Sequence, residues 1–227
     1  MFEQQPEALQ QKIKQLAAAS DADPSAWFET VYAQSQGDTS EVPWAKLRPH
    51  PSLVDWLSCD KIQGEGKLAL VIGCGLGDDA EAVASRGFQV TAFDISPTAI
   101  AWCERRFPNS TVTYQVADLF DLDRQWHGKY DFIFESHTIQ ALPLKVRSKT
   151  ISAIAPLVAP NGTLLVVTRL RDTDAEPEGP PWALSDRELA GFETLGLSEL
   201  ERERFDRSDT VTEVRIEYHR PADAISG

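Results

Sequence analysis

KLALVIGCGLGDDAEAVASRGFQVTAFDISPTAI, residues 67–100, is the stretch that decides the fold of this chain of 227 residues. Leu68 to Ile72 form an unbroken, partly β-branched apolar run, which is typical of a strand buried on both faces of a parallel sheet. Gly73, Gly75 and Gly77 follow at alternate positions. Glycines there allow a tight turn whose backbone can come close to a ligand. The stretch therefore begins as a strand that runs into a glycine-rich loop.

A helix and a second strand complete the unit. Residues 78–86 predict a helix, because acids occupy its first turn and Gly87 follows its last residue. Residues 88–93 predict a strand that brings Asp94 to its carboxyl end. Asp94 follows Gly73 by 21 positions, close to the spacing at which a βαβ nucleotide site places an acid on ribose hydroxyls. The pattern predicts a βαβ unit that binds a cofactor.

Asp78 separates two possible cofactors for this unit. The dinucleotide fingerprint G-x-G-x-x-G has glycine or alanine where this chain has Asp78. A carboxylate there would face a pyrophosphate at a helix N-terminus, which is electrostatically unfavourable. S-adenosylmethionine has a ribose diol, an adenine and a zwitterionic methionine but no phosphate. We therefore favour it over the cofactor of an NAD or nucleotide-sugar enzyme.

The composition limits the number of domains and the kinds of partner. A chain of this length with 42% hydrophobic residues can form one domain with a sizeable core. The net charge of −13 argues against nucleic acid and against anionic membranes as partners. The three cysteines, Cys59, Cys74 and Cys103, lack the spacing of a zinc site or a disulfide framework, so no metal is expected. With no apolar signal core or membrane span, we expect a cytoplasmic protein, a monomer or weak dimer, that acts on a small molecule.

Strands and helices alternate over residues 67–168. Residues 111–116, 129–134 and 163–168 predict strands, residues 96–107 and 146–158 predict helices, and residues 160–162 predict a turn. This alternation predicts a parallel sheet with helices on both faces.

The segments at the two ends of the chain differ from this pattern. Residues 185–194 predict a helix that begins with a capping box of Ser185 and Glu188. Residues 197–206 and 210–220 predict a hairpin at the sheet edge. Residues 6–19, 26–36 (capped by Ser25) and 50–58 predict helices. We interpret residues 1–60 as a helical lid segment of the same domain as residues 61–227; simple packing through its aromatic residues is the alternative.

Four segments resemble one enzyme superfamily. VIGCGLGDD (71–79) and VTAFDIS (90–96) resemble motif I and the acidic second-strand end of class I S-adenosylmethionine-dependent methyltransferases. GPPWALSDREL (179–189) is similar to the GGPPF/Y-x-x-S segment of halide and thiol methyltransferases, within the thiopurine methyltransferase-like group. Trp27 and VPW (42–44) resemble the W…TPWD entry segment of that group. The resemblance implies an α/β fold: a Rossmann-like, seven-stranded, mostly parallel sheet with an antiparallel C-terminal hairpin.

Two departures from the family pattern fall where the acceptor is expected. TPWD is here VPWA, with Val42 for threonine and Ala45 for aspartate, and SHTIQALP (136–143) replaces the aromatic cluster that usually follows the fourth strand. The substrate of the relatives therefore cannot be transferred directly.

The cofactor site is predicted at the carboxyl ends of the strands, where open α/β sheets bind ligands. Asp94 is expected to accept two hydrogen bonds from the ribose diol. Asp118 is expected to accept from the adenine amino group, or to be a capping acid instead, and Ile95 and Leu119 to sandwich the purine. The resemblance adds Trp27 and Trp44 beside the methionine part, where an aromatic face can contact a sulfonium. The other predicted cofactor residues are Gly73, Cys74, Gly75, Gly77 and Glu135.

The predicted reaction follows from the resemblance. It implies in-line displacement at the sulfonium methyl, with S-adenosylhomocysteine as product and orientation as the main role of the protein. His137 is the candidate general base; the alternative is a histidine whose ring is hydrogen-bonded by backbone at a strand end. Arg169 and Trp182 are candidates for the acceptor pocket, and surface packing is the alternative for both. We expect a thiol or another soft nucleophile as acceptor. A tellurite-resistance-type or O/N-directed methyltransferase, or a non-catalytic S-adenosylmethionine-binding regulator, remains the alternative.

Overall fold

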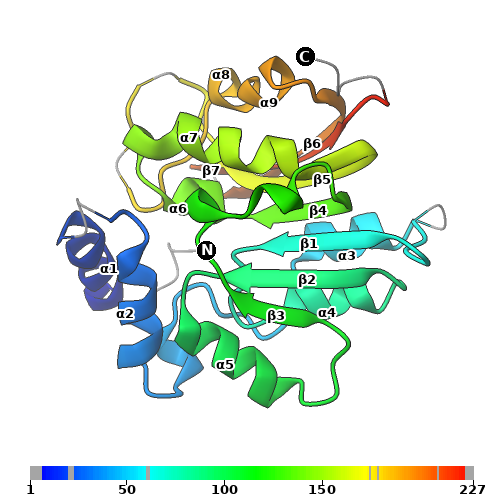
Figure 1. Cartoon of the computed structure of the whole chain (residues 1–227). Helices are drawn as coiled ribbons and strands as arrows, with labels where there is room; N and C mark the ends of the chain where they lie inside the picture. The colour runs from blue at the N-terminus through cyan, green and yellow to red at the C-terminus, as the bar shows by residue number, and fades with distance from the viewer. Residues whose placement is uncertain are drawn as a thin grey trace.

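A mixed sheet of seven strands lies at the centre of the molecule. The computed structural model describes residues 7–19, 23–59, 62–173, 175–177, 179–208 and 210–222. The strand order is β3-β2-β1-β4-β5-β7-β6 (Figure 1). The strands are β1 Leu68–Ile72, β2 Gln89–Asp94, β3 Thr113–Val116, β4 Tyr130–Ser136, β5 Val158–Leu170, β6 Ser198–Ser208 and β7 Val211–His219. Strands β1 to β5 pair in parallel and β7 is antiparallel to both its neighbours, which confirms the predicted fold class and its C-terminal hairpin.

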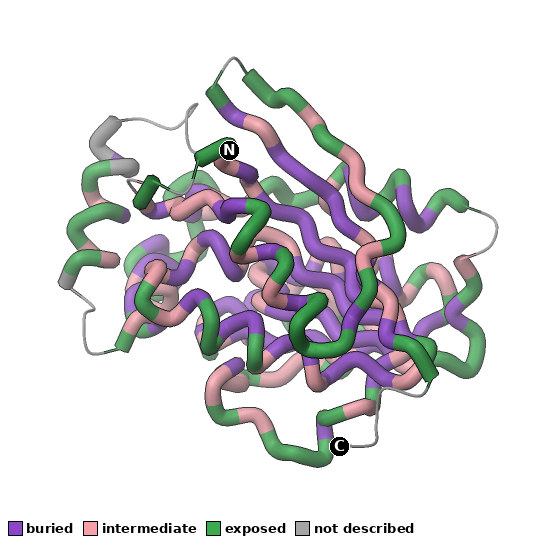
Figure 2. Tube along the Cα trace, turned by 90° about the horizontal axis from the view of Figure 1, so that it is seen from above, coloured by how far each residue is buried: buried purple, intermediate pink, exposed green. Residues whose placement is uncertain are grey.

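Helices cover both faces of the sheet. One face carries α3 Pro51–Leu57, α4 Asp78–Ala84 and α5 Pro97–Arg106; the other carries α6 Thr138–Ala141, α7 Arg147–Ile154, α8 Asp186–Leu189 and α9 Gly191–Thr194. The side chains of β1 alternate between the two cores, with Ala69 and Val71 in one and Leu70 and Ile72 in the other. This explains why the run 68–72 is apolar throughout. Figure 2 shows the central strands buried along most of their length.

The N-terminal helices lie at the carboxyl ends of the parallel strands. In Figure 1, α1 Glu7–Ala19 and α2 Ala26–Gln34 stand on the side to which the arrowheads of β1 and β2 point. Ile13 of α1 packs against Trp27 and Val31 of α2. The carboxylate of Glu29 accepts hydrogen bonds from Ser96 Oγ at 2.5 Å and Thr98 Oγ1 at 2.6 Å. The helices are therefore joined to the first turn of α5. Over the described residues, no helix has the length and apolar character to cross a membrane.

Single turns of 3-10 helix occur in several connections. They span Thr39–Glu41, Leu119–Asp121, Arg124–Trp126, Leu144–Val146 and Ala155–Leu157. The last of them replaces the end of the helix predicted over residues 146–158. Helix α7 ends at Ile154 because Pro156, two residues later, cannot donate the next helical hydrogen bond.

Three other local predictions need correction. The turn predicted at residues 160–162 is a bulge inside β5, because the β4–β5 register shifts between Tyr130 and Phe132 and Asn161 adopts a left-handed conformation with φ 60°. The capping box at Ser185 forms, but the predicted helix breaks into α8 and α9 beside Gly191, a poor helix former. Ser25 precedes α2 without capping it, since its hydroxyl donates to the Asp23 carboxylate instead.

Candidate functional site

A cavity of about 600 Å³ opens at the carboxyl ends of the parallel strands. Its wall combines the loop after β1, the end of β2, the loop after β3, the turn after β4 and the N-terminal segment. The volume is in the range of sites that hold a small ligand. Nine of the predicted cofactor residues and the predicted base lie on this wall: Trp27, Trp44, Gly73, Cys74, Gly75, Asp94, Ile95, Asp118, Leu119 and His137.

The glycine loop is held tightly between two other elements. A Cβ on Gly73, which has φ 59°, would lie 2.4 Å from Thr138 Oγ1 of α6. A Cβ on Gly75, which has φ 55°, would lie 3.2 Å from the hydroxyl of Tyr32. The absence of a side chain therefore lets the loop pack closely against Thr138 and Tyr32, which also line the cavity. Gly77 differs: its Cβ position faces Tyr114 and Cys103, away from the cavity wall, so it shapes the turn and is not placed to contact a cofactor.

Asp94 lies at the end of β2 with 7% of its surface exposed. One carboxylate oxygen accepts from Gly75 N and the other from Ser96 N, both at 3.0 Å. Each oxygen of an ionised carboxylate can accept a second hydrogen bond, so the group can still receive two hydroxyls of a diol. Burial raises the pKa of Asp94 to about 6, although the hydrogen bonds from Ser96 and Gly75 oppose the rise. The group is thus ionised near neutral pH and close to its titration range.

Asp118 fits both of the roles considered for it. Its side chain accepts from Phe120 N at 2.8 Å and caps the 3-10 turn Leu119–Asp121, as a capping acid does. It also lies on the cavity wall next to Leu119. The cap fixes the direction of its carboxyl group, which leaves it suited to a fixed partner in the cavity.

Tyr32 joins the predicted tryptophans at the cavity. Trp44 Nε1 donates to the Tyr32 hydroxyl at 2.6 Å, and the ring of Trp44 meets that of Trp27 edge to face at 5.8 Å between centroids. Tyr32 was not among the residues predicted at the cavity. Its hydroxyl reaches the site because α2 packs across the glycine loop.

Two residues of the glycine loop have roles that the sequence did not indicate. Asp78 forms a bidentate ion pair with Arg106, at 2.7 and 2.8 Å. This pairing compensates the charge that was expected to disfavour a pyrophosphate, so Asp78 discriminates less between cofactors than the sequence indicated. Cys74 is hydrogen-bonded to Cys103 and buried, and both effects raise the pKa of its thiol well above the usual value. The thiol therefore stays protonated at neutral pH and is not a nucleophile.

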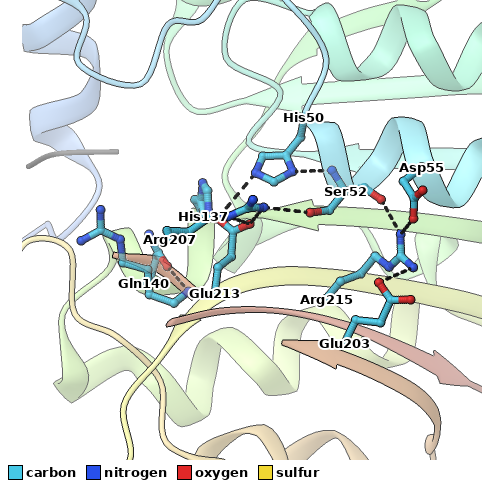
Figure 3. A network of polar contacts seen from close by, with 10 residues as sticks. His50, Ser52, Asp55, His137, Gln140, Glu203, Arg207, Glu213 and Arg215 are labelled. Atoms are coloured by element: carbon cyan, nitrogen blue, oxygen red, sulfur yellow. Dashed lines mark hydrogen bonds and ion pairs between the residues drawn. The ribbon is translucent and has the colours of Figure 1, made fainter. Parts of the chain in front are cut away.

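A cluster of polar side chains, His50, His137, Arg207 and Glu213, forms another part of the cavity wall. Figure 3 shows His50, His137 and Arg207 converging on the carboxylate of Glu213. His137 Nε2 lies 3.2 Å and His50 Nε2 lies 3.7 Å from Glu213 Oε2. Arg207 contacts the other oxygen, Oε1, at 2.5 Å. Burial alone would raise the pKa of Glu213, but the hydrogen bonds from the two histidines and Arg207 hold it well below its usual range.

His137 adopts a strained conformation in the turn between β4 and α6. Its φ is 64°, in the left-handed region that is uncommon for residues other than glycine, although histidine enters it more often than most, and its N–H donates to Val167 O at 2.9 Å. Burial lowers the pKa of its imidazole, and the charge of nearby Arg169 adds to the lowering, whereas Glu213 opposes it. The ring is therefore neutral at neutral pH.

Besides Gly77, three predicted residues are not on the cavity wall. Glu135 is fully buried because its carboxylate accepts from Thr138 N at 2.7 Å and Ile139 N at 2.9 Å, at the start of α6. Trp182 is held by Gln140 O and lines a smaller hollow beside α1. Arg169 lies opposite Glu213 in the β5–β7 ladder but does not line the cavity. The cofactor role predicted for Glu135 and the acceptor-pocket role predicted for the other two therefore stay predictions that the cavity wall does not support.

Besides Tyr32, the residues that sequence reasoning missed are His50, Arg207 and Glu213. His50 caps α3, since its Nδ1 accepts from Ser52 N at 3.2 Å. The sequence offered one signal for it, its place directly before Pro51 at the start of a predicted helix. Glu213 lies 76 residues beyond His137 and looks like any polar position of a strand. Only the pairing of β7 with β5 brings it to the site.

Comparisons with known proteins place the chain in a family. A family model described as thiopurine S-methyltransferase matches residues 34–220. "Probable thiol methyltransferase 2" of Arabidopsis thaliana is 28% identical over 170 residues, which cover 70% of this chain and 73% of that protein. A thiopurine S-methyltransferase of Shewanella pealeana is 34% identical over 116 residues, 51% of each chain. A ubiquinone biosynthesis O-methyltransferase of Dechloromonas aromatica is 30% identical over 125 residues, 54% of this chain and 53% of that one. The matches thus span about half the length of the last two relatives.

Solved structures support the fold. A structure from work on the conversion of a disulfide bond into a thioacetal group during echinomycin biosynthesis superposes with a TM-score of 0.68 at 20% identity, covering 86% of this chain and 93% of that chain. Magnesium protoporphyrin IX methyltransferase of Synechocystis PCC 6803, with S-adenosylmethionine bound, gives 0.59 at 21% identity and covers 74% and 76%. At these identities the likeness concerns the fold. The family model, in contrast, spans most of the sequence, from the last residue of α2 to the residue after β7, and the chain therefore belongs to the thiopurine S-methyltransferase family.

Proposed function

We propose that this protein transfers a methyl group from S-adenosylmethionine to a small molecule that reacts through a soft nucleophile, in the first place a thiol. The observation that carries the proposal is the arrangement of the wall of a single cavity. Asp94 and the glycine loop lie at one end of it, and the histidine cluster lies at another. The family match and the relatives named as thiol and thiopurine methyltransferases support a sulfur acceptor.

The residues on the wall fit S-adenosylmethionine. Asp94 offers two acceptor oxygens for a ribose diol, and Ile95 and Leu119 offer apolar surface for a purine. Gly73 and Gly75 line the cavity as backbone without side chains, and the rings of Trp27 and Trp44 suit a cationic sulfonium. When bound, the cofactor supplies a methyl group that is already activated for displacement. The protein then has to align the acceptor and exclude water.

The segment 1–60 is proposed to act as a lid over this cavity, apart from its residues outside the described range. Trp27, Tyr32 and Trp44 contribute to the wall, and Glu29 ties α2 to the first turn of α5, next to Asp94. A lid of this kind excludes water from the methyl group during transfer.

Replacement of Glu29 by alanine tests the lid. Loss of its hydrogen bonds to Ser96 and Thr98 should lower the fraction of molecules with α2 docked, and weaken S-adenosylhomocysteine binding by about threefold to tenfold. The measurement is isothermal titration calorimetry. The matched control is Glu104→Ala, which removes an exposed glutamate from α5, the helix to which Glu29 of α2 is bonded. Equal affinities for the two variants would show that α2 packs on the domain without acting as a lid.

An acceptor panel tests the activity. Purified protein is incubated with S-adenosylmethionine and, in turn, alkyl and aromatic thiols, hydroxylated aromatic compounds, iodide and tellurite, and release of S-adenosylhomocysteine is measured. Turnover highest with thiols supports the proposal. Turnover confined to tellurite or to oxygen or nitrogen acceptors would support the alternative methyltransferases; the ubiquinone biosynthesis O-methyltransferase relative is one reason to include oxygen acceptors. Tight binding of S-adenosylhomocysteine without turnover would support a regulator.

A further inference from the structure

The contacts of His50, His137 and Glu213 indicate which ring nitrogen of each histidine carries the proton. His50 Nδ1 accepts the backbone hydrogen bond from Ser52 N, so the ring proton of His50 is on Nε2. That N–H points toward Glu213 Oε2, 3.7 Å away. The carboxylate of Glu213 is ionised and can only accept. His137 Nε2, at 3.2 Å from the same oxygen, therefore carries a proton as well.

These positions of the protons are not compatible with a metal ion bound by the three residues. Ligand atoms of the three residues lie within 4.8 Å of one another, a spacing that could hold a metal if each offered a lone pair. His50 Nε2 has none, because Nδ1 of that ring is used to cap α3. If His50 Nε2 bound a metal, the ring proton would move to Nδ1. The hydrogen bond from Ser52 N would then be lost, and the two N–H groups would face each other. The cluster is arranged to hold protons.

His137 is left with one free lone pair, on Nδ1. Within the described part of the chain, no hydrogen bond engages this nitrogen. The ring lies on the wall of the same cavity as Asp94, and the next residue, Thr138, packs against the Gly73 position of the cofactor loop. The strained φ of His137 is the kind of backbone distortion that persists at functional sites.

We propose that Glu213 and His50 hold His137 as a general base that acts through Nδ1, and that the acceptor is consequently a protic nucleophile with a pKa above neutrality, such as an alkyl thiol or a hydroxyl compound, and not a halide. The inference rests on the proposed methyl transfer. A halide has no proton to lose, so a base oriented by a buried carboxylate would have no function with it.

The proton and electron balance of the step is complete without another reactant. The S–H or O–H bond of the acceptor breaks and its proton passes to His137 Nδ1. The electron pair of the acceptor atom forms the new bond to the methyl carbon. The pair of the broken carbon–sulfur bond stays on the donor sulfur, which leaves as a neutral thioether. The imidazolium is stabilised by Glu213 and later loses its proton to solvent. Glu213 and His50 act through His137 and are positioning residues.

Charged groups from four elements face His137 and set its pH dependence. They are Glu213 of β7, Arg207 of β6, Arg169 of β5 and His50 before α3. The base must be neutral to act, so kcat should rise with pH and reach a plateau above the pKa of His137, which lies below its usual value. The measurement uses saturating S-adenosylmethionine, so that the titration of Asp94, which affects cofactor binding, does not change kcat.

Two acceptors separate a base from a merely structural residue. With an alkyl thiol, which is protonated at neutral pH, His137→Gln should lower kcat by about 100-fold, the lower end of the range for general acid–base catalysis. With an acidic aromatic thiol, already a thiolate, the loss should be at least about tenfold smaller because no proton needs removal. His127→Gln, at an exposed position before β4, is the control and should match the wild type. Equal losses with both thiols would overturn the proposal.

Glu213→Gln gives a second, spectroscopic test. The glutamine carbonyl would turn to Arg207, which donates, and its NH₂ would face His137 Nε2. His137 would then carry its proton on Nδ1, and this nitrogen would have no lone pair left to take a proton from the acceptor. Long-range ¹H–¹⁵N correlation of the imidazole rings should show the Nε2–H form of His137 in the wild type and the Nδ1–H form in Glu213→Gln, with kcat for the alkyl thiol lowered about as much as in His137→Gln. An Nδ1–H form in the wild type would refute the proposal. A wild type that binds S-adenosylhomocysteine but methylates none of the panel would instead refute the proposed function.

Discussion

Replacing Asp94 by alanine is expected to weaken the binding of S-adenosylhomocysteine by roughly tenfold to 100-fold. The carboxylate lies on the cavity wall, and its two oxygens are held in place by Gly75 N and Ser96 N. A hydrogen bond to a charged group contributes about 1.5–3 kcal/mol, and each 1.4 kcal/mol is about a factor of ten in affinity. Calorimetric titration measures the change directly. Unchanged affinity would contradict the assignment of Asp94 to the ribose.

The same residue predicts a pH dependence of binding. The ligand hydroxyls require an ionised acceptor, and burial raises the pKa of Asp94 to about 6 in the ligand-free protein. Affinity should therefore be full above pH 7 and fall as the pH is lowered through about 6. Asp94→Asn serves as control, because its amide does not titrate. Its affinity should be weak and nearly constant from pH 5 to 7.5, about the range that spans the wild-type transition. A flat profile in the wild type would show that Asp94 does not bind the ligand in its ionised form.

Replacing Gly73 by alanine is expected to be the most disruptive single change in the glycine loop. The new methyl group would lie 2.4 Å from Thr138 Oγ1 and 3.2 Å from its Cγ2, and the backbone has φ 59°. The left-handed conformation costs about 1–2 kcal/mol for a side chain, and overpacking adds about 1–3 kcal/mol. The free energy of unfolding should fall by roughly 2–5 kcal/mol, the sum of the two costs, and cofactor binding should be lost because the loop must move. Urea unfolding and calorimetry give the two quantities.

Two further variants divide this effect into its causes. Gly66 is exposed and also left-handed, with φ 75°, but no atom lies within 4 Å of its Cβ position. Gly66→Ala should therefore show only the conformational cost. Thr138→Ala removes both atoms nearest to the Gly73 position, so the Gly73→Ala, Thr138→Ala double variant should recover the part due to overpacking. If Gly73→Ala is no worse than Gly66→Ala, close packing of the loop against α6 is not what requires glycine there.

The fold, and the placing at the cavity of the residues proposed to bind the donor, follow from local sequence patterns. The apolar run 68–72, the glycines after it and the acid at the end of the next strand predict a βαβ unit, because each signal lies within about 30 residues, the size of such a unit. The alternation of strands and helices then predicts a parallel sheet, and the structure has one with the predicted hairpin at its edge. Asp94, Gly73 and Gly75 reach the cavity wall because their places are set by the strand ends themselves.

Only the tertiary structure decided which other side chains face the cavity. Glu135 stands at the end of its strand, yet its carboxylate turns to the amides that begin α6, and the Cβ position of Gly77 faces Tyr114 of β3 and Cys103 of α5. Their sequence neighbours His137 and Gly75 lie on the wall instead. The direction of a side chain depends on strand register and on what packs next to it, and neither can be read from strand ends alone.

The sequence by itself determined the class of fold, the family resemblance and the residues expected to bind the donor, since those depend on short-range spacing. The end of the cavity at which we propose that the acceptor binds depends on contacts between distant segments. His50, His137 and Glu213 come from the N-terminal segment, the turn after β4 and the last strand, and the β5–β7 pairing brings Glu213 within 3.2 Å of His137. No local pattern marks such a meeting, because strand pairing and helix packing create it only when the whole sheet is assembled. The tertiary structure alone therefore assigned a carboxylate partner to the histidine that the sequence had singled out.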